Sequence, residues 1–255
     1  MRLGLLLLGW FPAIQGSYAM PISRSSLLRC AALIVCGVCL SVSGRPAVAE
    51  TPAGPQAVVE TFDADLLAAM RGAGPLGPKG RFARLEPSMA GAFDMKGMAQ
   101  RIMKARWKHL TDDQKARYVA AFARFETAQY AAWFDTYTGQ SFQVGPAQPI
   151  PGGGMMISSV MTGGGGPKLV LDYSVAQGED GGWRIVDVRY AGWMSVVDRR
   201  SSEFVDITAR LGVEALIARL DASTQSALAR ADDHAAPHLL QYRTELWSLP
   251  LPAID

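Results

Sequence analysis

The sequence predicts an α+β fold in which helices pack against one face of a curved antiparallel sheet of four strands. Helical periodicity dominates residues 58–137. Over residues 142–190 the apolar period changes from 3.6 to 2, and short Gly-rich turns separate the segments. Helical segments return after residue 201. Because strands joined by such short turns pair antiparallel, the order helices, sheet, helices indicates α+β.

The first 49 residues have the features of a secretory signal peptide and are not expected to belong to the fold. Arg24 and Arg29 form a basic region, residues 30–42 are apolar, and an Ala-Val-Ala cleavage pattern ends at Ala49. We therefore expect an exported protein that is cleaved near Ala49.

A second apolar run, at residues 3–8, lies upstream of this signal. The simplest explanation is that translation truly begins at Met20. An N-terminal membrane anchor is the alternative, but both apolar runs are too short to span a bilayer.

Removal of the signal changes the composition that matters for function. All three Cys and four of the 25 basic residues lie within it, which leaves 21 basic and 23 acidic residues and a net charge of −2. Without Cys, residues 50–255 can form neither a disulfide nor a thiolate metal site. Without a basic stripe, nothing favours nucleic acid as a partner. We expect a single domain over residues 50–231 and a poorly ordered tail over residues 232–255.

Three helical segments are expected first in the exported chain. Residues 58–70 place apolar side chains on one broad face. The Gly- and Pro-rich residues 72–80 are expected to form a loop. A short helix over residues 82–93 should kink near Pro87. Asp94 is a good N-cap for a third helix that runs to about Leu110.

The longest helix is expected to begin after Thr111, since Thr111 and Gln114 form a capping box, and to continue to Gly139. Its aromatic side chains spread over about half of the circumference, which is wider than one packed face requires. This helix therefore buries two surfaces, or one surface and the wall of a cavity; plain core packing is the alternative. The aromatic residues are Tyr118, Phe122, Phe125, Tyr130, Trp133, Phe134 and Tyr137.

Four strands and two helices complete the expected fold. The strands cover residues 142–147, 155–162, 167–175 and 183–190. Alternation places two sets of side chains on the inner face of the sheet: Leu169, Leu171, Tyr173 and Val175 on one strand, and Val186, Val188 and Tyr190 on the next. The final helices, residues 201–211 and 213–228, are separated by Gly212.

No pattern of catalytic or metal-binding residues stands out. His109 ends a helix, and His234 and His238 are four residues apart with a Pro between them and no third ligand nearby. Nucleophile-elbow and phosphate-binding motifs are absent from the sequence. Asp172 and Asp187 lie on strands, where outward-facing surface charges explain them better than acid–base chemistry.

Arg199, Arg200 and Glu203 lie where the last strand passes into a helix. A local ion pair is expected, and contact with a headgroup or a partner is the alternative. The exported chain is also rich in Met, an adaptable side chain that suits surfaces of variable shape. Apolar lining without catalytic groups indicates a cavity for an apolar ligand.

Motifs in register along residues 57–225 resemble the periplasmic MlaC-like family, also called toluene-tolerance proteins. The resemblance is carried by Phe93-Asp94-Met95, Trp107, Leu110 to Gln114, Phe122, Tyr130, Tyr137 to Gln140, Phe142, Asp172-Tyr173, Trp183 to Val188, Gly192 to Ser195, Arg200 and Glu203-Phe204. Tyr130 to Asp135, Arg199 to Phe204 and Gly212 to Leu220 are similar to the hopanoid-associated HpnM branch.

The resemblance implies a monomeric periplasmic protein without cofactor or catalytic activity, whose helices and sheet enclose a pocket for phospholipid or hopanoid. It also implies exchange of lipid with an inner-membrane transporter complex of the ABC or RND type, and with an outer-membrane complex as a further partner. The residues expected to line the pocket are Met98, Ile102, Tyr118, Phe122, Phe125, Tyr130, Phe134, Tyr137, Val160, Leu169, Leu171, Tyr173, Val186, Val188, Tyr190, Met194 and Phe204.

Two other functions remain open at this point. The first is an enzyme on a similar cone-shaped α+β fold, for which Asp172, Tyr173 and Tyr190 are the only catalytic candidates. The second is an adaptor that docks on a transporter through its sheet edge and binds no lipid.

Overall fold

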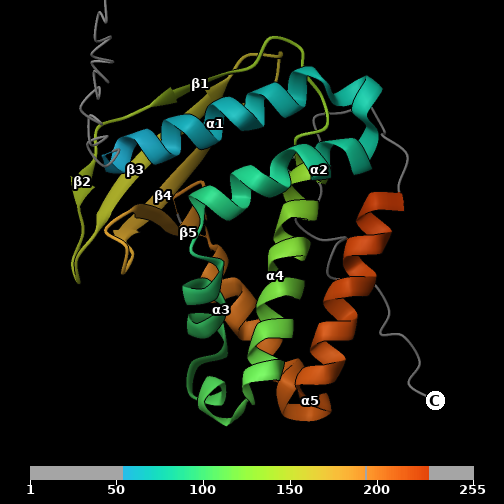
Figure 1. Ribbon diagram of the computed structural model, residues 1–255. Coiled ribbons are helices and arrows are strands. Elements are labelled where there is room, and N and C mark those ends of the chain that lie inside the picture. The colour runs from blue at the N-terminus through green and yellow to red at the C-terminus, as the bar shows by residue number, and fades with distance from the viewer. Residues whose placement is uncertain (1–53, 193, 230–255) are drawn as a thin grey trace, which may run out of the picture. The chain divides into compact units, whose positions relative to one another are not determined.

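The computed structural model describes residues 54–192 and 194–229, and it confirms the α+β fold (Figure 1). Four α-helices precede an antiparallel sheet, and a long bent helix follows it. The expected signal peptide and the expected tail lie outside the described residues. None of the described helices is both long and apolar enough to cross a membrane.

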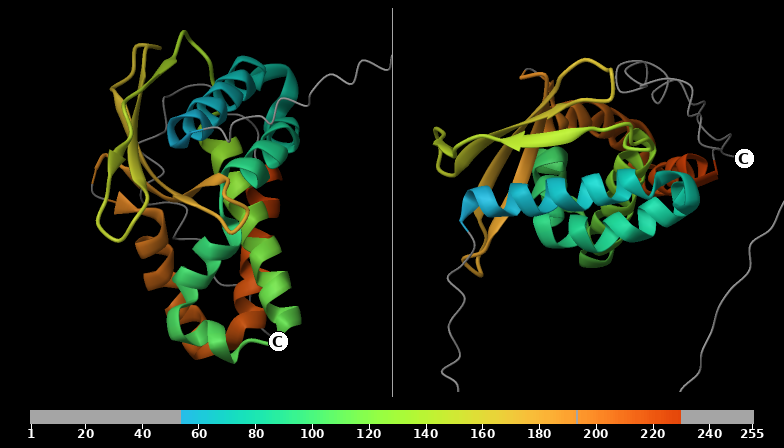
Figure 2. Two further views of the ribbon diagram at one scale, coloured as in Figure 1. Left: turned by 60° about the vertical axis from the view of Figure 1, so that its left-hand side comes forward. Right: turned by 90° about the horizontal axis from the view of Figure 1, so that it is seen from above.

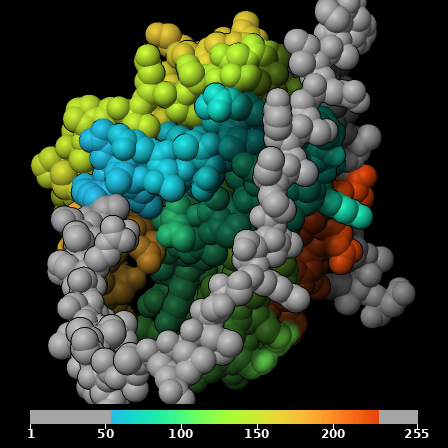
Figure 3. Space-filling view, turned by 45° about the horizontal axis from the view of Figure 1, so that its top comes forward, coloured from blue at the N-terminus to red at the C-terminus, as the bar shows by residue number. Residues whose placement is uncertain are grey.

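Helix α1, Pro55–Arg71, matches the first expected helix. Pro55 occupies the first turn, where the missing N–H costs no hydrogen bond. One face buries Val59, Phe62 and Leu66 completely, at the spacing of successive helical turns. In the space-filling view, α1 lies at the surface beside α2 and the chain segment of β1 and β2 (Figure 3).

Helix α2, Ala73–Ala92, corrects two expectations. Gly72 forms the turn between α1 and α2, and residues 73–80 are helical except for Gly77, whose φ of 59° and ψ of −179° suit only a residue without Cβ. Pro87 lies inside the helix, and the break is at Gly77 instead. The fully buried Arg81 donates to the carbonyl oxygens of Ala131 (2.7 Å) and Ala73 (3.2 Å), and so ties both parts of the helix to α4.

Helix α3, Met95–Met103, begins as expected, because the Asp94 carboxylate accepts from the Gly97 N–H over 2.8 Å. It ends seven residues before Leu110. Lys104 has a φ of 50° and a ψ of −131°, which stops the α-helix, and residues Lys104–His109 form the 3₁₀ helix η1.

Helix α4, Asp112–Trp133, starts with the expected capping box: Thr111 Oγ1 accepts from the Gln114 N–H over 3.1 Å, and Gln114 Oε1 accepts from the Thr111 N–H over 3.1 Å. The helix ends at Trp133 and not at Gly139. Tyr137 therefore lies beyond the helix, where it is 39% exposed and carries the Arg71 guanidinium over its ring.

The sheet contains six antiparallel strands in place of the four expected. They are β1 Ser141–Val144, β2 Gln148–Pro149, β3 Met155–Thr162, β4 Leu169–Gln177, β5 Trp183–Tyr190 and β6 Met194–Ser195. The order is β1-β3-β4-β5-β6, and β2 also pairs with β3. Both additional strands have only two residues, too few to produce a periodic signal.

A bulge in β5 contradicts the prediction that Val186 lies on the inner face of the sheet. Tyr173 lies opposite Val188, but Val175 lies opposite Ile185, so Val186 has no cross-strand partner. The extra residue reverses the alternation, and Ile185 is fully buried while Val186 is half-buried. The carbonyl oxygen of Val186 instead accepts from the Arg101 guanidinium.

Helix α5, Val196–Ala229, is broken at Gly212 (φ 81°, ψ 171°), as expected, although its first segment begins earlier than residue 201. The second segment packs beside α4 and carries two ion pairs with it: Arg117 with Glu214 (2.7 Å) and Arg124 with Asp221 (2.6 Å). Figure 2 shows the helices gathered on one side of the sheet.

The core lies between the inner face of the sheet and these helices. Phe62 contributes three edge-to-face ring contacts at its centre, to Phe93 (4.9 Å), Tyr130 (5.4 Å) and Tyr173 (6.2 Å between centroids). Phe122 and Phe125 pack in the same way against Phe204 of α5.

Candidate functional site

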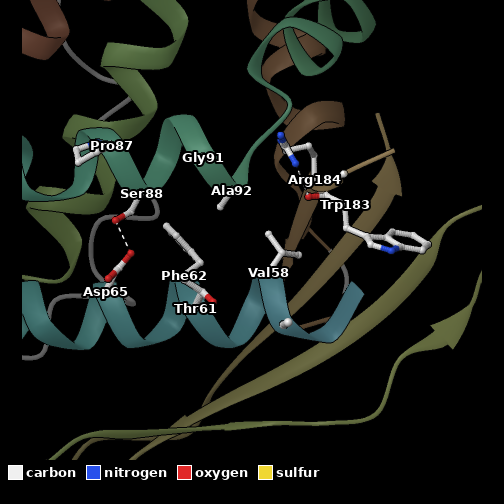
Figure 4. Close-up of a pocket in the computed structure, with 12 residues that line it drawn as sticks. Val58, Thr61, Phe62, Asp65, Pro87, Ser88, Gly91, Ala92, Trp183 and Arg184 are labelled. Carbon is white, nitrogen blue, oxygen red and sulfur yellow. Dashed lines mark hydrogen bonds between the residues drawn. The ribbon is translucent and has the colours of Figure 1, made fainter. Parts of the chain in front are cut away.

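An open groove of about 540 Å³ runs between α1 and α2 and ends at the beginning of β5 (Figure 4). Its volume is in the range that small-molecule sites occupy. Twelve residues line it: Ala57, Val58, Thr61, Phe62, Asp65, Pro87, Ser88, Gly91, Ala92, Gly182, Trp183 and Arg184.

Helix α1 supplies the wall and the floor of this groove. Val58, Thr61, Phe62 and Asp65 recur at three- and four-residue intervals, which places them on one face of the helix. The side chain of Phe62 extends from α1 toward α2 (Figure 4), and its ring touches the core aromatics Phe93, Tyr130 and Tyr173. Phe62 therefore separates the groove from the interior of the protein.

Helix α2 faces the groove with small residues. Gly91 and Ala92 leave the space between the helices open, and a Cβ added at Gly91 would meet no atom within 4 Å. At one end, Ser88 donates a hydrogen bond to Asp65 over 2.6 Å and links the two helices (Figure 4).

The other end of the groove is formed by Trp183 and Arg184 of β5. The Arg184 guanidinium donates to the Trp183 carbonyl and to Asp180, both over 3.0 Å. The groove thus has apolar walls, one end with the hydrogen-bonded Asp65 and Ser88, and one end with the Arg184 guanidinium. It suits an elongated molecule that is mostly apolar.

A second groove of about 510 Å³ lies on the other side of Arg184, between α3 and the turn that joins β4 to β5. Its lining is polar and carries three basic side chains, Arg101, Lys104 and Arg184, with Asp94 as the one acidic residue. The main-chain N–H of Asp94 donates to the Ile185 carbonyl over 2.9 Å and holds α3 against β5.

A carboxyl group is buried between α1 and the sheet. Asp63 of α1 is 2% exposed and accepts from Ser159 (2.5 Å) and Tyr173 (3.0 Å). Burial raises the pKa of Asp63 to about 6, and the hydrogen bonds from Ser159 and Tyr173 partly oppose that rise.

A buried ion pair lies deeper, between α4 and α5. The Arg200 Nε donates to Glu126 over 2.6 Å, and the Arg200 guanidinium stacks over Phe125 at 4.5 Å. Arg199 pairs with Glu203 at 3.6 Å, as expected from the sequence, whereas the pairing with Glu126 was not expected. Burial raises the pKa of Glu203 to about 7, against the neighbouring guanidinium charges.

Most of the predicted pocket residues lie together in the core. Those that are buried are Met98, Ile102, Tyr118, Phe122, Phe125, Tyr130, Phe134, Leu171, Tyr173, Val188 and Phe204. Those that are half-buried are Val160, Leu169, Val186, Tyr190 and Met194, and Tyr137 is exposed. Of the whole set, only Val186 lines either of the two grooves.

The residues of the first groove were not recognised from the sequence. Ala57, Gly91 and Ala92 carry no chemical signal, and Val58 and Phe62 were assigned only to a buried helix face. The register at which α2 crosses α1 decides which small residues face the groove, and that register is not visible in either helix alone.

The carboxylates considered for catalysis have structural partners. Asp172 accepts from Ser158 and faces away from Tyr173, as expected. Asp187 accepts from the Ser195 hydroxyl (2.7 Å) and from the main-chain N–H groups of Val188 (2.9 Å) and Val197 (3.1 Å). Within residues 54–192 and 194–229, no group of three His, Cys, Asp or Glu residues is arranged to hold a metal ion.

Two comparisons place this fold among known proteins. The family model described as MlaC protein matches residues 61–222, from α1 to the second segment of α5. The structure is also similar to that of the phospholipid-binding protein from Ralstonia solanacearum, solved in complex with a phospholipid. The TM-score is 0.60 and the identity is 23%, over 69% of this chain and 99% of the other.

Proposed function

The chain belongs to the MlaC family, and on that premise we propose that it is a periplasmic carrier that binds a lipid and exchanges it with membrane-bound complexes. The observation that carries the proposal is the family match over residues 61–222, which covers almost the whole described domain. The fold of a protein whose structure holds a phospholipid gives further support.

The physical chemistry of the core is compatible with this function. Burial of a methylene group is worth about 0.8 kcal/mol, so one acyl chain supplies a large driving force for binding. Aromatic and Met side chains dominate the interior next to Phe62, and such side chains can repack around a flexible chain. Release then requires a partner that opens the protein or offers the lipid a better site.

The groove between α1 and α2 is the proposed mouth for the apolar chains. Phe62 at its floor adjoins Tyr130 and Tyr173, two of the residues predicted to line the pocket. Displacement of the Phe62 ring would connect the groove with the interior between α4 and the sheet. In this arrangement Tyr130, Leu171, Tyr173 and Val188 contact the chains, and the headgroup stays outside.

Phospholipid is the first candidate ligand, and a hopanoid is the second because of the resemblance of residues 199–220 to the hopanoid-associated branch. Exchange with an inner-membrane transporter and an outer-membrane complex, the monomeric state and cleavage of a signal peptide are parts of the same proposal. The absence of catalysis is also part of this proposal. It is supported by the hydrogen bonds of the Asp172 and Asp187 carboxylates to serine side chains.

Lipid extraction from the exported protein tests the proposal. The protein is purified without detergent, its lipids are extracted with organic solvent, and the extract is identified by mass spectrometry. A stoichiometric phospholipid or hopanoid is expected. Absence of lipid, together with failure to take up lipid from labelled vesicles, would leave the adaptor as the better function.

A further inference from the structure

Four buried side-chain donors on α4 and one carboxylate oxygen of Glu203 lack hydrogen-bond partners within residues 54–192 and 194–229, and two of these donors lie four residues apart on one face of α4. These two are the side-chain amide nitrogen of Gln129 and the indole nitrogen of Trp133. Gln129 is only 1% exposed. More than nine in ten buried polar groups in proteins are hydrogen-bonded, and an unmet buried donor costs about 1–3 kcal/mol. Within the described residues no acceptor lies within hydrogen-bond distance of these two donors, so a bound ligand or a water molecule would have to supply one.

Both donors come from the same side of α4. Gln129 and Trp133 are four residues apart, and such residues lie one above the other on a helix. Glu126, one turn before Gln129, is on the same face and is engaged with Arg200. The Trp133 ring meets Tyr190 of β5 edge-on at 5.5 Å, and Tyr190 in turn lies within electrostatic reach of Glu126 and Arg200.

We call these side chains, with Glu203, the α4–α5 polar cluster. Its members are Glu126, Gln129, Trp133, Tyr190, Arg200 and Glu203. Its two carboxylates, Glu126 and Glu203, face the member Arg200 and, from outside the cluster, Arg199. The cluster therefore holds no surplus cation, and a phosphate group would bring a negative charge that this largely buried site does not compensate. A neutral oxygen acceptor fits it better.

The members of the cluster differ in their burial. Gln129, Glu126 and Arg200 are buried, whereas Trp133 and Tyr190 are half-buried. Apolar side chains adjoin it along α4, with Phe125 on one side and Phe134 on the other. A ligand with a neutral polar segment between apolar chains matches this sequence of environments.

We propose that the α4–α5 polar cluster binds the ester carbonyl oxygens of a lipid, through hydrogen bonds donated by Gln129 Nε2 and Trp133 Nε1. The inference rests on the proposed function as a lipid carrier. It adds to that function a means of selecting ester-linked lipids from other apolar molecules of similar size.

Two lipids that differ only in their linkage test the proposal. The delipidated exported protein is titrated with a diacyl phosphatidylglycerol and with its dialkyl ether analogue of equal chain length, which lacks the carbonyl oxygens. With about 0.5–1.5 kcal/mol expected for each of the two hydrogen bonds, the wild-type protein should bind the ester about five- to 150-fold more tightly. Gln129→Met and Trp133→Phe should each reduce this preference and leave affinity for the ether unchanged.

Tyr118→Phe is the matched control. The Tyr118 hydroxyl is also buried and unpartnered within the described part of the chain, and the charges of Glu126 and Arg200 act on it too, but eleven residues of α4, about 16 Å along the helix axis, separate it from Gln129. This variant should keep the preference for the ester. Two test variants are used so that a folding defect in one, seen by thermal unfolding, leaves the other informative.

The possible results separate the two proposals. Equal binding of ester and ether by the wild-type protein overturns the inference and leaves the carrier function in place, with water as the partner of the two donors. Equal loss of preference in Tyr118→Phe and in the test variants also overturns the inference. Failure of both lipids to bind overturns the carrier function itself, and the inference with it.

Discussion

The Nε of Arg200 donates a hydrogen bond to Glu126 over 2.6 Å, and both side chains are about 95% buried although 74 positions separate them in the sequence. Burying both charges is costly, and only their close geometry offsets that cost. Loss of one partner therefore has a much larger effect than loss of a surface ion pair.

Glu126→Ala should lower the free energy of unfolding by about 3–5 kcal/mol, because it leaves the buried Arg200 charge without its close partner and with the longer 3.8 Å pairing to Glu203. Urea denaturation measures this change. Arg124→Ala is the control: it breaks the exposed Arg124–Asp221 pair, which has the same 2.6 Å distance, and should cost less than about 1 kcal/mol. Equal costs in the two variants would contradict the assignment of a buried pair.

Asp63 should make the protein less stable as the pH rises from about 4 to about 6. Its pKa is about 6 in the folded protein and 3.8 in the unfolded chain, so the unfolded chain loses its proton first as the pH rises. Each pH unit in that interval is worth about 1.4 kcal/mol, which gives a loss on the order of 3 kcal/mol. Above about pH 6, Asp63 causes no further change in the stability of the protein.

Urea denaturation at a series of pH values checks this dependence, and Asp63→Asn should remove it. Ser159→Ala tests the direction of the pKa shift. It removes a hydrogen bond that lowers the pKa of Asp63, so the fall in stability should extend above pH 6. A curve that shifts toward lower pH in Ser159→Ala would show that another group is responsible.

Gly91→Leu should obstruct the groove between α1 and α2. A Cβ at Gly91 meets no atom within 4 Å, so the larger side chain extends into open space and does not strain the fold. Replacement of a helical Gly should also stabilise α2 by about 0.5–1 kcal/mol. We expect slower uptake of a fluorescent phospholipid from vesicles, with an unchanged or higher melting temperature.

Gly74→Leu is the control for Gly91→Leu. Gly74 lies in the same helix with open space at its Cβ position, but it does not line the groove. Its uptake rate should equal that of the wild-type protein. Equal rates in all three proteins would place the mouth of the pocket elsewhere.

Leu171→Trp should reduce the amount of lipid that is purified with the protein. Leu171 is fully buried on the inner face of β4, and the larger ring fills volume that the proposed chains would occupy. Overpacking of this kind costs about 1–3 kcal/mol, which a domain of ordinary stability survives. Lipid phosphorus per mole of folded protein measures the effect; unchanged occupancy, together with an unchanged result for Phe122→Trp, would place the chains elsewhere.

Features set by neighbouring residues were predictable from the sequence. The capping box of Thr111 and Gln114, the Asp94 cap and the break at Gly212 are local, and the structure confirms each one. The resemblance to the MlaC family was also correct, because it rests on residues spread over the whole domain.

Features set by distant partners were not predictable. Residues 72–80 look like a loop, but the Arg81 side chain binds the carbonyl oxygen of Ala131, fifty residues away, and holds a helix there. Val186 fits the alternation of its own strand, yet the pairing with β4 introduces a bulge beside it. The groove likewise depends on small residues, whereas the sequence drew attention to large aromatic residues that form the core.

The two ion pairs between α4 and α5 form only at one axial register of these helices. Arg117 and Arg124 are seven residues apart on α4, and their partners Glu214 and Asp221 are seven residues apart on α5, in the same direction. The chain reverses at Gly212, so that two parallel helices meet with the repeat of a coiled coil. One inserted residue between Gly212 and Glu214 would turn both acidic side chains by about 100° and separate both pairs at once. The length of this short connection therefore sets the register of the second segment of α5 against α4.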